Sequence, residues 1–241
     1  MVALAAIIAA VSLAPATLLD ARIAGATGQS AGLIDTEGTV WHGRGTVVMA
    51  TTRIPVAWEI DIRPLLEGVV RVRVRSGTGA ATPRATIAFR TDGVALRDVD
   101  VTIPAGALAA LLDRTAAGSV VGDVSVLADD LELGAGRQRG DARLVWRGAG
   151  IAGIVGSAML DLGDVRSTLS ANGEALAGPL ANEGGDLALV GEWKMHPRDG
   201  LSLALRLTPR RTDAAKLKAA LAAVATADGD GWRVDWHVPL R

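Results

Sequence analysis

The stretch GDLALVGEWKMHPRDGLSLALRLTP, from Gly185 to Pro209, shows most directly how this chain folds. Its first half places large apolar side chains on one parity, at Leu187, Leu189, Trp193 and Met195. Alternation with a period of two is the pattern of a strand with one buried face. The segment from Pro197 to Gly200 supplies turn chemistry, because proline presets φ and glycine tolerates φ > 0. A second alternating run follows, with leucine at 201, 203, 205 and 207. The stretch therefore predicts a β-hairpin.

The same alternation recurs along most of the chain, in short runs that glycine or proline interrupts about every 8 to 12 residues. The predicted strands lie at 31–48 (as two strands), 54–62, 69–75, 85–89, 94–103, 122–127, 131–134, 142–146, 158–162, 166–171 and 232–240. A change of parity predicts a bulge near Arg97 and Asp98. Helical spacing predicts two short helices, at 104–113 and 212–223, whereas 149–156 is too glycine-rich to assign. We expect a mainly β domain, either a strongly curved antiparallel sheet or a flattened β-sandwich.

Composition narrows the possible functions of the domain. The chain has 241 residues, 49% of them apolar, yet only 3% are aromatic, so alanine, valine and leucine must form most of the core. A formal net charge of -1 provides no field that would attract nucleic acid, and we expect no nucleic-acid partner. The absence of cysteine excludes disulfides, thiolate metal sites and cysteine nucleophiles.

The first nineteen residues, MVALAAIIAAVSLAPATLL, contain no charged side chain. That length approaches the ~20 residues that a helix needs to cross a bilayer. We expect residues 1–19 to form a transmembrane helix that anchors the protein in the inner membrane. Residues 20–241 would then form a single β-rich domain in the periplasm. Two other interpretations stay open: a cleaved signal segment, with Ala14–Ala16 as the small-residue cleavage site, and a buried core segment.

Three arginines alternate with valines in the predicted strand 69–75. Arg71, Arg73 and Arg75 share the parity opposite to the valines, so they are expected to point outward together. This arginine row is the candidate interaction surface of the sequence, for an anion or a protein partner. The simpler interpretation is that arginine on the wet face of a strand keeps the domain soluble and discourages edge pairing.

The sequence contains no recognisable catalytic or metal-binding motif. His42, His196 and His237 are far apart and lack the short spacings typical of metal ligands. Asp129–Asp130 and Asp228–Gly231 fit turns better than a calcium loop, since the closing glutamate of an EF-hand is missing. No serine stands in a nucleophile-elbow context. We therefore expect no enzymatic activity, no cofactor and no metal.

Six tryptophans supply nearly all the large aromatic surface. They lie nearly one per predicted hairpin, at positions 41, 58, 146, 193, 232 and 236. Exposed tryptophans could anchor a partner. Their alternation with polar neighbours favours core packing instead.

Several segments, in order, resemble the type II secretion system protein N family. They are GTVWHGRG from Gly38, RPLLEGVVRVRV after Trp58, VDVTIPAGALAALL from Val99, ARLVWRGA, PLANEGGDLALVGEW from Pro179, LALRLTPR and the closing DGDGWR. The most specific of them is the pattern N-x-G-G-D-L-x-L-x-G-x-W. The resemblance covers almost the whole chain. It departs at the start, where members usually carry a charged tip and no charged residue precedes Asp20 here.

This resemblance implies a non-enzymatic accessory or structural subunit of the machinery that exports folded proteins, with other secretion subunits of the inner membrane and periplasm as partners. The predicted curved sheet leaves a second class open, a periplasmic lipid-binding or lipid-transfer module with an apolar groove. A continuous unfilled concave surface would favour the lipid module, whereas a closed core would favour the structural subunit.

Overall fold

The structure is a computed structural model that describes residues 14–49, 51–61, 63–77, 83–112, 119–134, 137–155, 158–196, 199–210, 221 and 225–238. Its strands are β1 (Ala31–Gly38), β2 (His42–Met49), β3 (Thr52–Asp61), β4 (Val70–Arg75), β5 (Arg84–Arg90), β6 (Gly93–Pro104), β7 (Val120–Gly134), β8 (Arg137–Val155), β9 (Ala158–Gly173), β10 (Ala175–Glu183), β11 (Leu187–His196), β12 (Gly200–Pro209), β13 (Thr226–Asp228) and β14 (Gly231–Val238). The helices are α2 (Thr17–Ala26), α3 (Ala105–Leu112) and the 3-10 helix η1 (Arg63–Glu67).

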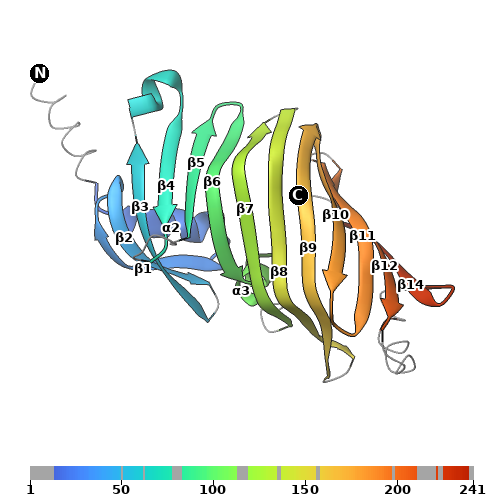
Figure 1. Cartoon of the computed structure of the whole chain (residues 1–241). Coiled ribbons are helices and arrows are strands. Elements are labelled where there is room, and N and C mark those ends of the chain that lie inside the picture. The colour runs from blue at the N-terminus through green and yellow to red at the C-terminus, as the bar shows by residue number, and fades with distance from the viewer. Residues whose placement is uncertain are drawn as a thin grey trace, which may run out of the picture.

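All the described strands belong to one antiparallel sheet of 14 strands, with the order β1 to β12, then β14 and β13 (Figure 1). Each strand from β1 to β11 pairs with the next one in sequence, so the chain forms a long meander. β14 pairs with β12, and β13 folds back onto β14 as a short hairpin. The curved antiparallel sheet is confirmed, and the alternative of a flattened sandwich is wrong.

Curvature brings the first strands of the sheet toward β6. A buried cluster of Ala31, Met49 and Ala107 joins β1, β2 and α3, and Ile103 of β6 packs against it. Helix α2 lies along β1, and a second cluster packs Ala16 against Leu33 and Trp58. These two small clusters close one end of the sheet.

The strand predictions are right wherever alternation is unbroken. The hairpin of β11 and β12, the strand β4 and helix α3 all lie where the sequence places them. The bulge is also confirmed, since Asp98 has φ of 49° and the β5–β6 register shifts beside it.

Three predictions about the strands are wrong. The separate strands expected at 122–127 and 131–134 are one strand, β7, and those at 158–162 and 166–171 are one strand, β9. β8 runs for 19 residues and includes most of the glycine-rich segment. The pairing register shifts within these long strands, but the strands continue through the shifts. In the sequence the same positions interrupt the alternation and were interpreted as strand ends. β10 was not predicted at all.

The described part of the chain contains no membrane-spanning helix, and its first helix, α2, has 10 residues. Residues 1–13, most of the expected anchor, lie outside the described residues. The helix expected at 212–223 also lies outside them, apart from Leu221, which is buried against Leu187 and Trp232 in a third cluster.

Candidate functional site

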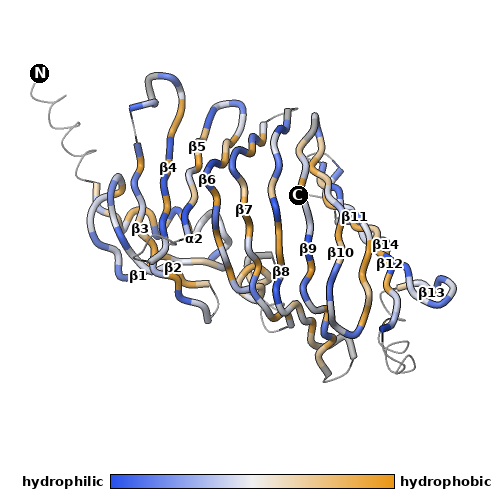
Figure 2. Tube along the Cα trace, viewed as in Figure 1, coloured by the Kyte–Doolittle hydropathy of each residue, from blue (hydrophilic) through white to orange (hydrophobic). Residues whose placement is uncertain are grey.

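The sheet has one apolar face and one polar face, and residues that pair across neighbouring strands show both. Ile60, Val72, Ile87, Leu96 and Leu131 are successive partners from β3 to β7, and every one is apolar. This side of the sheet is called the apolar face below. Hydropathy alternates along the strands in the same way (Figure 2).

The neighbouring set of partners lies on the other side of the same five strands. Glu59, Arg73, Thr86, Arg97 and Asp130 are paired in succession, and all are polar or charged. This side is called the polar face. Two ion pairs lie along this set, Arg73 with Glu59 at 2.7 Å and Arg97 with Asp130 at 3.2 Å. The two faces therefore offer opposite chemistry to a partner or ligand.

An apolar pocket of about 170 Å³ lies over the curved part of the apolar face. Residues of five successive strands, β2 to β6, and of the loop before β5 line it: Val47, Met49, Ile54, Val56, Val74, Ser76, Pro83, Arg84, Ala85, Val101, Thr102 and Ile103. Arg84 and Thr102 border the pocket, but their side chains belong to the polar face, because these residues pair in register with Arg75 and Ser125. The pocket therefore offers hydrophobic contacts and little hydrogen bonding.

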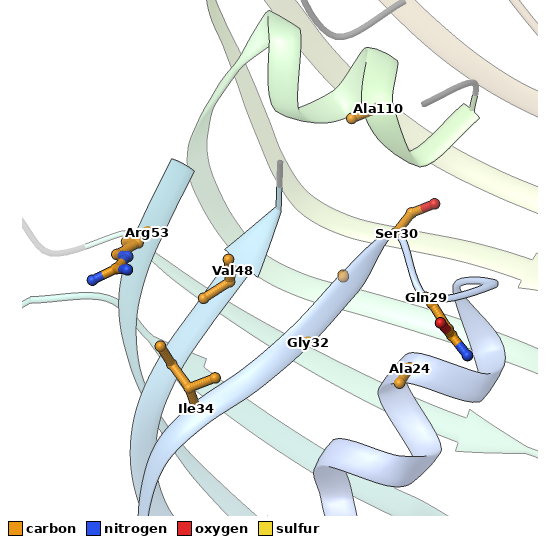
Figure 3. A pocket seen from close by; sticks show the side chains of 9 residues that line it. Ala24, Gln29, Ser30, Gly32, Ile34, Val48, Arg53 and Ala110 are labelled. Atoms are coloured by element: carbon orange, nitrogen blue, oxygen red, sulfur yellow. The ribbon is translucent and has the colours of Figure 1, made fainter. Parts of the chain in front are cut away.

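A larger pocket of about 640 Å³ lies at the β1 end of the sheet (Figure 3). Ala24 and Gln29 border it on the α2 side, Ala110 of α3 lies above, and Arg53 lies on the far side. Among the described residues of the lining, Arg53 is the one charged side chain. These lining residues therefore combine weakly polar and apolar contacts and include no acid–base pair.

The arginine row lies on the polar face, as predicted from its parity. Arg73 and Arg75 both approach Glu59, at 2.7 Å and 4.0 Å, and their side chains are 40% and 64% exposed. Arg71 pairs in register with Asp61 and Ala88. Exposed pairs of this kind stabilise a protein by about 0–1 kcal/mol. Their geometry is that of a partly exposed strand surface with partial charge compensation.

The three histidines do not come together in the fold. His42 lies on β2, His196 on β11 and His237 on β14. His196 approaches Glu174 at 3.4 Å and Asp199 at 3.2 Å. The described residues contain no group of three or more histidine, cysteine or acidic side chains placed to hold a metal ion.

The two acidic segments singled out in the sequence differ in outcome. Asp129 and Asp130 lie within the strand β7, so the turn expected there is wrong, and Asp130 forms an ion pair with Arg97 on the polar face. Asp228 and Gly231 close the hairpin of β13 and β14, as turn chemistry predicts. Asp228 and Asp230 each lie 3.8 Å from a guanidinium nitrogen of Arg206. The carboxylates of the β13–β14 turn therefore lie near a cation of the same chain, Arg206.

Four of the six tryptophans belong to the described core clusters, as predicted, whereas Trp41 is half-buried outside those clusters and Trp236 is exposed. Trp58 and Trp232 are buried, and Trp146 and Trp193 pack against buried clusters. Trp236 was expected in the core, but 53% of its surface is exposed. It lies on the apolar face opposite Leu203, but on β14, near the end of the sheet. The prediction is wrong there because β14 lacks a full-length outer neighbour within the described residues.

Comparison with known families adds one finding. A family model described as Type II secretion system (T2SS), protein N, matches residues 30–234. The matched range begins just before β1 and ends within β14, so it extends across the whole sheet. Curated proteins gave no match, and neither did solved structures.

Proposed function

The chain belongs to the type II secretion system protein N family, and we propose that it serves the secretion machinery as a non-enzymatic structural subunit. The observation that carries this proposal is the family match over residues 30–234, because it extends from one edge of the sheet to the other. Other subunits of the secretion machinery are then its partners. The two chemically distinct faces of the sheet supply surfaces for such contacts.

We further propose that the apolar N-terminal run anchors the protein in the inner membrane and that the rest of the chain forms one domain in the periplasm. The run has no charge before Asp20, but its last residues belong to the domain, since Ala16 is buried against Leu33 and Trp58 and α2 begins at Thr17. An anchored subunit should stay with the membrane in alkaline carbonate. Release of the full-length chain into the carbonate supernatant would contradict the anchor alone and leave the secretion role open.

Deletion of the coding sequence tests the function. We expect proteins that are normally exported to accumulate inside the cell envelope, and the full chain supplied in trans to restore their release. Measurement of exported protein in the medium gives the result. Lipid asymmetry of the outer membrane, measured in the same cells, should be unchanged. Normal secretion in the deletion strain would contradict the proposed role.

A lipid-binding or lipid-transfer module is the second candidate, and one observation favours it. The apolar pocket lies on a continuous apolar face, and its lining consists mainly of aliphatic side chains. Small-molecule sites are typically concave and mostly apolar. Loss of outer-membrane lipid asymmetry with normal secretion would favour this candidate. Loss of neither property would exclude both roles.

We propose that the arginine row keeps the polar face hydrated and is not the contact surface for a partner. Each exposed pair that is broken there should cost about 1 kcal/mol or less. We expect the double change Arg71→Glu and Arg73→Glu to leave secretion unchanged, as measured by exported protein in the medium.

Arg166→Glu provides the matched control. Arg166 also forms an exposed ion pair, at 3.0 Å from Glu183, but on β9 and β10. A secretion defect in the double variant and normal secretion in the control would show that the arginine row binds a partner.

A further inference from the structure

The two edges of the sheet differ in how they are protected. At the β1 edge, α2 and the residue that follows it supply side chains to the strand: Asp20 Oδ1 accepts the Leu33 N–H at 2.8 Å, and Thr27 Oγ1 accepts the Ala31 N–H at 3.1 Å. These bonds occupy positions that an added strand would need. Covering an edge in this way is a known protection against unwanted pairing.

The β14 edge is only partly covered. β13 pairs with residues 231–233 and ends at Thr226. Just before it, the Ala225 N–H donates to the Leu221 carbonyl and so takes no part in the ladder. Among the described residues, no strand lies beside the outer edge of Val234–Val238. Figure 1 shows β14 at the end of the sheet opposite β1.

Antiparallel geometry identifies the backbone groups that face this open edge. Asp228 and Gly231 close the two-residue turn of the β13–β14 hairpin, so the backbone N–H and C=O of Gly231 point toward β13. The direction of the backbone N–H and C=O groups alternates from one residue of a strand to the next. The groups of Asp235 and His237 therefore point to the same side as those of Gly231, at positions that β13 does not reach. The open edge therefore presents two donors and two acceptors.

The sequence of the open edge is nearly palindromic: Val234, Asp235, Trp236, His237 and Val238. We propose that β14 pairs with β14 of a second copy, antiparallel and centred on Trp236. Asp235 of each copy then forms a hydrogen-bonded backbone pair with His237 of the other. Within one copy Asp235 Oδ2 already binds Arg233 Nε, at 2.7 Å, and in the pair the carboxylate also faces an imidazole that can donate to its other oxygen, on the polar faces of both copies.

Comparison with a pairing centred on Asp235 shows why Trp236 is the centre. A pairing centred on Asp235 would oppose two carboxylates and would need the outer edge of Arg233, which β13 already occupies. The pairing centred on Trp236 uses both outward-facing residues of each copy. It also places the two Trp236 side chains at a non-hydrogen-bonded pair, where side chains approach most closely. That contact covers an indole of which 53% is exposed in the single chain.

A cysteine at the centre tests the register, because the chain has no cysteine of its own. We expect full-length Trp236→Cys to form a disulfide-linked dimer with copper phenanthroline, since Cα atoms at such a pair lie about 4.5 Å apart. Asp235→Cys is the control. Its two copies would stand diagonally, about 7–8 Å apart, beyond the reach of a disulfide. Equal cross-linking of both variants would overturn the proposal.

A second experiment does not depend on a disulfide. Sedimentation of the full-length chain in detergent should show a monomer–dimer equilibrium. Asp235→Pro should weaken it about 10-fold or more, because two outward N–H donors are removed per dimer. A thermal melt would confirm that the variant is folded. A chain that stays monomeric at all concentrations overturns the proposal.

The Trp236→Cys variant also shows whether a second copy or a different protein pairs with the open edge of β14 in the cell. Oxidation of membranes that contain Trp236→Cys should give an adduct of twice the mass of the chain. An adduct of another mass would mean that a different protein occupies the edge, and self-pairing would then be wrong. The secretion role is tested separately by the deletion, so either proposal can fail without the other.

Discussion

Gly185→Ala is expected to lower the free energy of unfolding by about 2–5 kcal/mol. Gly185 has φ of 74°, a conformation that costs an L-residue about 1–2 kcal/mol. A Cβ at this position would also lie 2.5 Å from the carbonyl carbon of Leu162 and 2.6 Å from the Gly163 nitrogen. Overpacking of this kind costs a further ~1–3 kcal/mol. The sum is a large share of the ~5–15 kcal/mol that stabilises a typical domain.

Hydrogen bonds around Gly185 explain why the backbone cannot move aside cheaply. The Asn182 amide donates to the carbonyls of Leu162 and Leu187, at 2.6 Å and 2.8 Å, and its oxygen accepts the Leu189 N–H. The Asp186 N–H donates to the Asp161 carbonyl at 2.8 Å. The turn between β10 and β11 is therefore tied to β9. A shift that makes room for a methyl group would break several of these bonds.

Gly184→Ala is the matched control for this prediction. Gly184 has nearly the same φ, 78°, but the nearest atom to its added Cβ would be Gly163 Cα at 3.9 Å. Only the backbone strain of about 1–2 kcal/mol should then appear. Urea unfolding followed by circular dichroism measures both losses. Equal losses in the two variants would show that the close approach to β9 contributes nothing.

Sequence alternation predicts a strand well when one face stays apolar without interruption. β4 and the hairpin of β11 and β12 have this property and were predicted. β10 was not, because its sequence contains Gly178 and Pro179 among small residues. The structure gives the reason for the glycine: a Cβ at Gly178 would lie 2.4 Å from the Thr168 carbonyl oxygen and 2.9 Å from Ser167 Oγ. Glycine in this strand permits its close approach to β9.

The parts of the candidate surfaces that depend on curvature could not be predicted from the sequence. Parity places the arginine row on a polar face, and that assignment is correct. The apolar pocket forms only because β2 and β3 curl toward β6, and no local pattern specifies that bend. The exposure of Trp236 depends on what lies beyond β14. The protection of β1 depends on contacts of Asp20 and Thr27 with a strand that comes later in the chain.

Trp58→Ala should lower the free energy of unfolding by about 3–5 kcal/mol, the usual cost of removing a buried tryptophan. Trp58 is 8% exposed and packs against Ala16 and Leu33. Its indole N–H donates to the Val40 carbonyl at 3.0 Å, and its ring lies over Gly43, where a Cβ would come within 2.4 Å of the ring. The alanine variant would leave a cavity bordered by a glycine, which has no side chain to fill it.

Trp236→Ala is the control for Trp58→Ala, because both tryptophans lie on the apolar face but only Trp58 is buried. Trp236 is 53% exposed, so its truncation should change stability by about 1 kcal/mol or less in the single chain. Urea unfolding at a protein concentration where the chain is monomeric measures both variants. Similar losses would mean that the edge of the sheet is as well packed as its first strands. A small loss for Trp58→Ala would mean that the cluster around α2 does not hold β1, β2 and β3 together.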